Sequence, residues 1–185
     1  MATYIYINGY PAVGKLTVAK ELEKRIPQSK VYDNHLMIDG VAALVERSSP
    51  HYQDLRTAAR RFFLDIISTH DVADGVTWIF TDSRENTPEA AAAAQDYKDA
   101  AARRNVPFVS VILHCDAPEN ERRVVGEGRG GRTNTKLVDV EILRQIRREE
   151  GLHRFGGDRE LELDITNLEP AVAAETIRRH VEQVT

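Results

Sequence analysis

The apolar residues of this chain alternate between two kinds of segment. Short, nearly uninterrupted runs have the length and the β-branched or aromatic content of buried strands. Longer segments repeat apolar residues three and four positions apart, which is typical of one face of a helix. The runs predict strands over residues 4–7, 31–32, 76–80, 107–113 and 161–165, and the longer segments predict helices over residues 15–25, 36–70, 89–104 and 170–184, with a further helix starting at residue 117.

This alternation indicates an α/β fold built around a parallel sheet. The run at 107–113, PFVSVIL, is apolar nearly throughout, which favours a strand buried on both faces. A chain of 185 residues is long enough for one full sheet with helices on both sides. We therefore expect a single domain over residues 1–185.

The region between the second and third strands predicts two helices, broken near residues 48–50. The second helix is long, and its neighbouring aromatic residues Phe62 and Phe63 are expected in the core. Arg56, Arg60 and Arg61 on the same helix are candidates to meet an anionic ligand, although a solvated helix face is the commoner position for such charges.

The first strand runs into a glycine-bounded loop and then a helix. Gly9 to Lys15 reads G-x-x-x-x-G-K, and glycines at these positions let successive backbone N–H groups converge on a phosphate. Lys15 would reach the outer phosphates as a point charge. A glycine-rich turn that binds nothing would leave this lysine at a helix N-terminus, where its charge is disfavoured. The predicted nucleotide-binding residues are Gly9, Pro11, Ala12, Val13, Gly14, Lys15, Leu16 and Thr17.

One position departs from the phosphate-loop pattern. A Ser or Thr that can hold Mg²⁺ is expected directly after the lysine, but Leu16 stands there and Thr17 follows. A leucine cannot bind a metal. We therefore expect Mg²⁺ to be held through water and by carboxylates elsewhere, with Thr17 on the inner phosphate or on a metal-bound water.

An acidic residue, Asp33, ends the second strand in the sequence VYDNH. Open parallel sheets bind their ligands at the carboxyl ends of the strands. Asp33 is thus predicted to orient or deprotonate an acceptor hydroxyl, or to bind Mg²⁺ through water. The alternative is that Asp33 or Asn34 only caps the helix that starts near His35.

A second acidic residue, Asp82, follows the third strand, VTWIF. A carboxylate at this position is predicted to hold Mg²⁺ through water. Ser83 and Arg84 come directly after it, where acceptor contacts are expected. The same three residues could instead form a turn before the helix that Thr87 opens.

The basic residues are concentrated late in the chain. Residues 122–148 hold eight basic and three acidic side chains, a net of +5 in a chain whose total is −4. Within them, residues 126–136 are rich in glycine, which is typical of a lid that closes over a triphosphate. Arg129 and Arg132 would neutralise charge on the transferred phosphoryl group. A surface loop with solvated charges is the alternative.

Composition limits the other classes of function. A net charge of −4 argues against a protein that mainly binds nucleic acid. The single cysteine, Cys115, excludes an internal disulfide and a multi-cysteine metal site. No apolar run approaches the length of about 18 residues that a membrane span needs, and the first strand begins too early for a signal peptide, so we expect a cytoplasmic protein.

The order of these features resembles the small P-loop kinases, in particular the branch of shikimate kinases, gluconate kinases and chloramphenicol phosphotransferases. The resemblance implies a three-layer α/β/α P-loop fold with a five-stranded parallel sheet of order 2-3-1-4-5. It implies that residues 35–71 form an acceptor-binding insert and residues 126–136 a lid. It also implies ATP and Mg²⁺ as cofactors, transfer of the γ-phosphoryl group to a hydroxyl of a small molecule, and a place for Arg123 near the adenine or its phosphates.

Two positions modify this resemblance. Shikimate kinases end the second strand in Asp-x-Asp, and this chain has His35 at the second of these positions, which disfavours shikimate as the acceptor. The loop after the last strand lies near the base in such folds, so Thr166 and Asn167 are predicted to contribute to the purine pocket; capping of the last helix explains them nearly as well. Adenylate kinases, which the chain also resembles in GKLT, show a similar departure after the lysine, GKGT, and remain active, which implies that the missing hydroxyl need not abolish phosphoryl transfer.

Other functions remain open from the sequence. A nucleoside monophosphate kinase is the first alternative, although no clear arginine set follows the second strand. A non-catalytic ATP-binding protein is the second, because of Leu16. A GTPase is disfavoured, since the nearest match to [NT]-K-x-D has Val138 in place of the aspartate. The expected partners are a nucleotide and a small acceptor, with the protein a monomer or homodimer.

Overall fold

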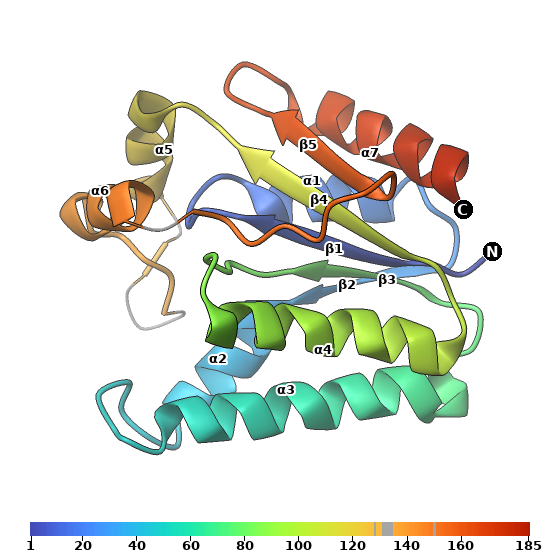
Figure 1. The fold of residues 1–185 in the computed structure, drawn as a ribbon. Helices are drawn as coiled ribbons and strands as arrows, with labels where there is room; N and C mark the ends of the chain where they lie inside the picture. The colour runs from blue at the N-terminus through green and yellow to red at the C-terminus, as the bar shows by residue number, and fades with distance from the viewer. Residues whose placement is uncertain (128, 131–134, 150) are drawn as a thin grey trace.

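A single parallel sheet organises the molecule (Figure 1). The computed structural model describes residues 1–127, 129–130, 135–149 and 151–185. The five strands lie in the order β2-β3-β1-β4-β5, and every neighbouring pair is parallel. They are β1 (Tyr4–Gly9), β2 (Ser29–Asp33), β3 (Thr77–Thr81), β4 (Phe108–His114) and β5 (Glu160–Asp164). The three-layer fold and the strand order expected from the sequence are confirmed.

The central strand, β1, is buried along all six residues. Ile5 pairs with Ile79 of β3 on one side and with Val109 of β4 on the other. Because all strands run the same way, their carboxyl ends meet at one edge of the sheet. The loops that follow β1, β2 and β3 are brought together there, which is where open parallel sheets bind ligands.

Helices cover both faces of the sheet (Figure 1). Helices α1 and α7 lie on one face, α3 and α4 on the other, and α5 and α6 lie beyond the carboxyl ends of the strands. Among the described helices, none combines the length and the apolar character needed to cross a membrane. The helices are α1 (Lys15–Glu23), α2 (Asn34–Ala42), α3 (Tyr52–Thr69), the 3-10 turn η1 (Asp71–Ala73), α4 (Pro88–Arg104), α5 (Ala117–Val124), α6 (Val140–Glu149) and α7 (Pro170–Val184).

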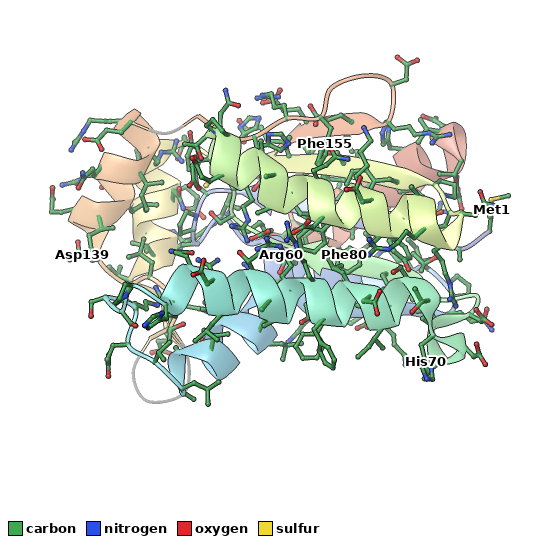
Figure 2. The ribbon with its side chains drawn as sticks, turned by 60° about the horizontal axis from the view of Figure 1, so that its bottom comes forward. Met1, Arg60, His70, Phe80, Asp139 and Phe155 are labelled. Carbon is green, nitrogen blue, oxygen red and sulfur yellow. The ribbon has the colours of Figure 1, made fainter. Side chains whose placement is uncertain are left out.

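The two faces of the sheet differ in composition. The face under α1 and α7 is aliphatic. The face under α3 and α4 is aromatic, with Tyr6 and Phe80 both packed on Tyr97 at ring distances of 5.0 and 5.1 Å. Phe155, from the segment after α6, adds its ring at 4.9 Å from Phe108 (Figure 2). This segment thus packs on the same face of the sheet as α3 and α4.

The expectation that both aromatic residues of α3 lie in the core is wrong. Phe62 is 63% exposed and Phe63 is 38% exposed. The helix instead buries Leu64 and Ile67 against the sheet. Since a helix turns about 100° per residue, Phe62 lies about 200° away from Leu64, on the solvent side. The periodicity predicted the helix correctly. The helix has more apolar residues than its buried face can hold, so some of them, including Phe62 and Phe63, remain exposed.

Candidate active site

The loop between β1 and α1 has the backbone geometry of an anion-binding nest. Ala12 and Gly14 both have positive φ, 65° and 112°, and Gly14 directly precedes the helix. Val13, between them, is fully buried and fixes the loop to the core. A Cβ on Gly9 would lie 2.4 Å from the carbonyl oxygen of Leu113, so only glycine fits at the end of β1, where Gly9 pairs with Leu113 of β4. Alternation of backbone conformation of this kind directs consecutive N–H groups to one side.

The carbonyl groups of the same loop are turned away and held by side chains. Asn120 and Arg123 come from α5, and Lys15 begins α1. Each carbonyl bond fixes a peptide plane, so the opposite N–H groups stay oriented without a ligand. The bonds run from Lys15 Nζ to the oxygens of Gly9 (2.6 Å) and Tyr10 (2.7 Å), from Asn120 Nδ2 to Pro11 (2.9 Å), and from Arg123 Nη1 to Val13 (2.6 Å).

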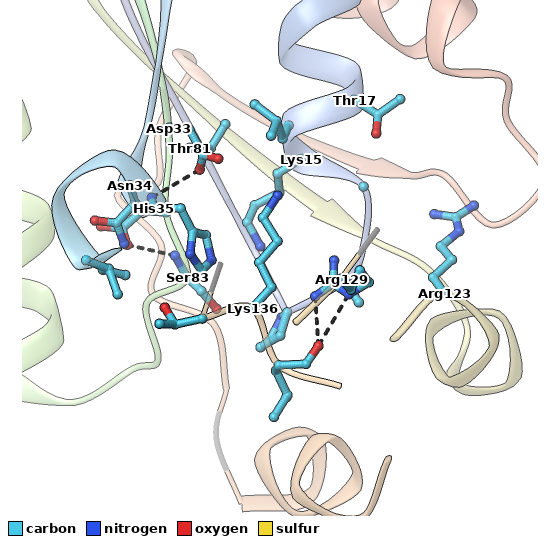
Figure 3. A pocket seen from close by; sticks show the side chains of 18 of the residues that line it. Lys15, Thr17, Asp33, Asn34, His35, Thr81, Ser83, Arg123, Arg129 and Lys136 are labelled. Carbon is cyan, nitrogen blue, oxygen red and sulfur yellow. Dashed lines mark hydrogen bonds between the residues drawn. The ribbon is translucent and has the colours of Figure 1, made fainter. Parts of the chain in front are cut away.

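Lys15 is the central cation of the site (Figure 3). The pKa of its ammonium group is lowered to about 7, mainly by desolvation and also by Arg129, while Asp82 and Asp33 act in the opposite direction. In the described part of the chain this ammonium forms no ion pair with a carboxylate, and desolvation disfavours its charged form. An anion placed beside Lys15 would restore the charge.

A cavity of about 900 Å³ extends from this loop along the carboxyl edge of the sheet. That volume is in the range of small-ligand and cofactor sites. The cavity brings together several residues that the sequence singled out from separate segments. Those that line it are Pro11, Ala12, Gly14, Lys15, Leu16, Thr17, Asp33, Asp82, Arg123 and Arg129.

The remaining predicted residues lie elsewhere. Gly9 and Val13 are buried beneath the loop and support it from below. Asn167 is exposed and is not among the residues that line the cavity, although its neighbours Leu168 and Ile165 are. Arg132 falls outside the residues that the structure describes.

Asp33 both caps a helix and faces the cavity. Its Oδ1 accepts the amide of His35 at 3.3 Å, which caps α2, and the hydroxyl of Thr81 at 2.8 Å. Figure 3 shows Asp33 and Thr81 beside Lys15. In the described part of the chain, no bond forms to Oδ2, which leaves one carboxylate oxygen for a ligand. The two sequence interpretations, cap and functional group, are therefore compatible in one side chain.

Asp82 occupies a buried network at the end of β3. Its side chain is fully buried. Oδ2 accepts from Arg84 Nε at 2.7 Å, and Oδ1 accepts from Asn34 Nδ2 at 2.7 Å and from the Ser83 amide at 2.8 Å. Tyr6 donates to Oδ2 at 3.4 Å. The predicted metal role of Asp82 stays a prediction, and the structure adds that this carboxylate connects three segments of the site.

Asn8 is a site residue that the sequence analysis passed over. It is fully buried at the end of β1. Its Oδ1 accepts the amides of Gly9 (2.9 Å) and Arg84 (2.8 Å), and its Nδ2 donates to the carbonyl oxygens of Arg84 (3.0 Å) and His153 (3.1 Å). All the bonding capacity of one amide is used to join the phosphate loop to the segment after β3 and to the segment after α6. The sequence held one signal for Asn8, a polar residue directly after the apolar run at residues 4–7.

The segment around the predicted lid contacts the insert. The hydroxyl and amide of Thr135 donate to Asp39 Oδ1 at 2.5 and 3.2 Å, and Arg47 Nη2 donates to the Thr135 hydroxyl at 2.7 Å. Arg129 donates to the carbonyl oxygen of Leu137 at 3.1 Å, and burial lowers the pKa of its guanidinium. Residues 135–137 therefore lie between α2 and the arginine that faces Lys15 (Figure 3).

The strand order, the anion nest and the cationic cavity together define a small P-loop domain with the fold of small-molecule kinases. A protein-family profile described as an AAA domain (AAA_18) matches residues 5–144, and the chain belongs to this family of P-loop domains. A comparison with curated proteins gave no match.

Solved structures share the fold along the whole chain. A sugar kinase from Janibacter sp. HTCC2649 is 17% identical, with a TM-score of 0.63, and the match covers 100% of this chain and 96% of that one. An APS kinase from Mycobacterium tuberculosis, solved with AMPPNP and APS, is 16% identical, with a TM-score of 0.63 and 98% coverage of both chains. A tunicamycin resistance protein from Deinococcus radiodurans is 20% identical, with a TM-score of 0.59 and coverage of 98% and 96%. The TM-scores show that the fold is shared. At identities this low, the similarity shows the fold alone.

Proposed function

We propose that this protein is an ATP-dependent kinase that transfers the γ-phosphoryl group to a hydroxyl of a small molecule. The observation that carries the proposal is that Lys15, Asp33 and Arg129 line one cavity. The cavity offers an anion nest at one end and, next to it, a carboxylate with an available oxygen. Its kinase-like neighbours among solved structures support the same reaction class.

In the proposed reaction, the loop amides hold the β-phosphate and Lys15 bridges the β- and γ-phosphates. The acceptor oxygen forms the new bond to the γ-phosphorus as the bond from that phosphorus to the oxygen of the leaving ADP breaks. Asp33 accepts the proton of the hydroxyl, while Lys15 and Arg129 offset the charge on the transferred group. Catalysis of phosphoryl transfer depends mainly on such positioning and charge stabilisation.

Magnesium would be held mainly by the phosphates and water. The described residues contain no group of three or more histidine, cysteine or acidic side chains able to hold a metal ion. Thr17 is exposed on the first turn of α1, and Asp33 has one available oxygen, so both can bind metal-bound water. The ion would supply charge neutralisation on the phosphates.

The test is Lys15→Met, assayed for ADP release with ATP, Mg²⁺ and a panel of sugars, nucleosides, monophosphates and hydroxy acids. We expect turnover to fall by about 100-fold or more, since removing one group that stabilises transition-state charge has effects of this size. Circular dichroism and the melting temperature provide the control for folding. Equal turnover by wild type and variant would reject the assignment.

The alternative of a nucleotide-binding protein without transfer activity follows from Leu16, which lines the cavity where a metal ligand is expected. The discriminating measurement is ADP release with and without an acceptor. A kinase releases ADP well above the water background only when an accepted hydroxyl compound is present. A non-catalytic protein binds ATP, with a shift in melting temperature, and releases no ADP with any acceptor.

A further inference from the structure

The acceptor end of the cavity contains buried polar atoms with unused bonding capacity. Tyr52 and Asn34 are 3% and 6% exposed, and both line the cavity. In the described part of the chain, the Tyr52 hydroxyl, the Asn34 side-chain oxygen and Arg56 Nε have no hydrogen-bond partner. A buried polar group without a partner is destabilising, so three of them that line one cavity indicate a missing ligand.

Arg56 differs from the two other arginines on the same helix. Arg60 forms an ion pair with Asp96 of α4 at 2.8 Å, and Arg61 reaches the same carboxylate at 3.3 Å. Figure 2 places Arg60 between the two helices. Among the described residues, Arg56 has no such ion pair. Its Nη1 donates to Gln53 Oε1 at 3.4 Å, and its guanidinium lies over the Tyr52 ring, 5.7 Å from the ring centroid, and lines the cavity. Arg56 is the arginine on α3 that is available to a ligand.

A second guanidinium lies close to this end without lining the cavity. Arg84 is paired with Asp82 through its Nε, and its Nη2 is buried without a partner in the described structure. Burial lowers the pKa of Arg56, and the nearby Arg84 lowers it further, while Asp82 has the opposite effect. Because desolvation disfavours the charged form of Arg56, an anion beside it would favour the charged form. Four more charged residues line the cavity: Arg47 and Lys136 are basic, and Asp33 and Glu85 are acidic.

We propose that the phosphoryl acceptor is itself an anion, a hydroxylated compound whose carboxylate, sulfate or phosphate group binds Arg56 and the Tyr52 hydroxyl. This inference rests on the proposed kinase function. Arg56 would donate a hydrogen bond from Nε to the oxyanion, and Asn34 Oδ1 would accept a hydrogen bond from a hydroxyl of the same molecule. The nearby Asp33 would then face the hydroxyl that is phosphorylated. Neutral alcohols would leave the guanidinium of Arg56 without an anionic partner and would be poor acceptors.

The kinetic test compares acceptors in matched pairs that differ by one anionic group, such as gluconate with glucitol and glycerate with glycerol. The proteins are wild type, Arg56→Gln and, as the matched control, Arg61→Gln. We expect wild type to prefer the anionic member, and we expect the ratio of kcat/KM values to fall about 100-fold in Arg56→Gln, as when one partner of a buried charge pair is removed. Arg61→Gln should keep the wild-type ratio. A neutral member used as well as its anionic partner would overturn the proposal.

A binding test decides the case in which no member of the panel is phosphorylated. With the nucleotide site first saturated by ADP, sulfate is titrated while the melting temperature is followed in the same three proteins. General salt effects are common to all three, so the measure is the difference between them. We expect wild type and Arg61→Gln to gain more stability than Arg56→Gln. Equal gains in all three would overturn the proposal.

The two hypotheses fail in different ways. If the kinase assignment is wrong, Lys15→Met releases ADP as fast as wild type, or ADP alone does not raise the melting temperature. If only the anionic acceptor is wrong, ADP binds and Lys15 is required, but Arg56→Gln leaves both the acceptor ratio and the sulfate response unchanged. Arg56→Lys adds a further distinction: it keeps the charge and loses the planar fork, so we expect an intermediate acceptor ratio.

Discussion

The two ends of the cavity are constructed differently. At the nucleotide end, main-chain groups of one loop form the nest, side chains hold its carbonyls away, and Lys15 adds a cation. At the proposed acceptor end, side chains from α2, α3 and the segment after β3 form the surface, and some of their polar atoms are unsatisfied. A backbone site tolerates many side chains because its geometry carries the function. The acceptor end can change its ligand by changing single side chains.

The largest expected effect comes from breaking the nucleotide end with Gly9→Ala. The added Cβ would lie 2.4 Å from the Leu113 oxygen and 3.0 Å from Val13, so the loop must move away from β4. We expect ADP affinity, measured by calorimetry, to fall by about 100-fold or more, as on loss of a positioned group. Gly40→Ala is the matched control, since no heavy atom lies within 4 Å of its Cβ. Normal ADP affinity in Gly9→Ala would contradict this account of the loop.

A second large effect, on stability and not on binding, concerns the network that joins the two ends. Asp82→Ala would leave the buried Arg84 without its carboxylate. We expect the free energy of unfolding in urea to fall by about 3–5 kcal/mol, the usual cost of breaking a buried ion pair from one side. The double variant Asp82→Leu with Arg84→Met removes both charges and should lose less. A loss below about 1 kcal/mol in Asp82→Ala would show that the network is not structural.

A smaller effect, dependent on pH, concerns Lys15. With a pKa of about 7 in the free protein, Lys15 becomes neutral as the pH rises above 7. Bound phosphate favours the charged form and raises this pKa, so binding takes up a proton. ADP affinity should then fall with rising pH above 7, by at most about tenfold per unit. Calorimetry in buffers of different ionisation heat measures the proton directly, and Lys15→Met should remove this component.

A weaker effect is expected where the acceptor end meets residues 135–137. Asp39→Ala removes the acceptor of the Thr135 amide and hydroxyl. We expect the KM for the acceptor to rise about threefold to tenfold, a loss typical of one or two hydrogen bonds. Thr135→Val should give a similar change, and the double variant should be no worse than either single variant. Additive losses would mean that the two residues act separately.

The smallest effect is expected away from both ends. The Thr87 hydroxyl accepts the amide of Ala90 at 3.2 Å and caps α4. Thr87→Ala should lower the free energy of unfolding by about 1 kcal/mol. ADP affinity and acceptor preference should stay at wild-type values. A change in either would mean that the cap of α4 influences the site.

Local patterns determined much of the fold and one end of the site. The apolar runs located all five strands. The inner strands β1, β3 and β4 are apolar nearly throughout because they are buried on both faces. The edge strands β2 and β5 are partly exposed, and only short apolar stretches marked them. The spacing Gly9 to Lys15 located the nest, since its geometry needs only consecutive residues and glycines at two places. Asp33 was found because a strand end is visible in the sequence as a change from apolar to acidic. Each of these features is contained within a few neighbouring residues.

Only the tertiary structure decided the acceptor end. Asn8, Asn34, Tyr52 and Arg84 each look ordinary in the sequence, and their importance comes from burial beside partners that are far away along the chain. The same is true of Arg56, which the sequence could not separate from Arg60 and Arg61. Asp96 lies where two of these arginines reach it and Arg56 does not pair with it. Which charges are paired and which are left for a ligand depends on packing between helices, and no local pattern encodes it.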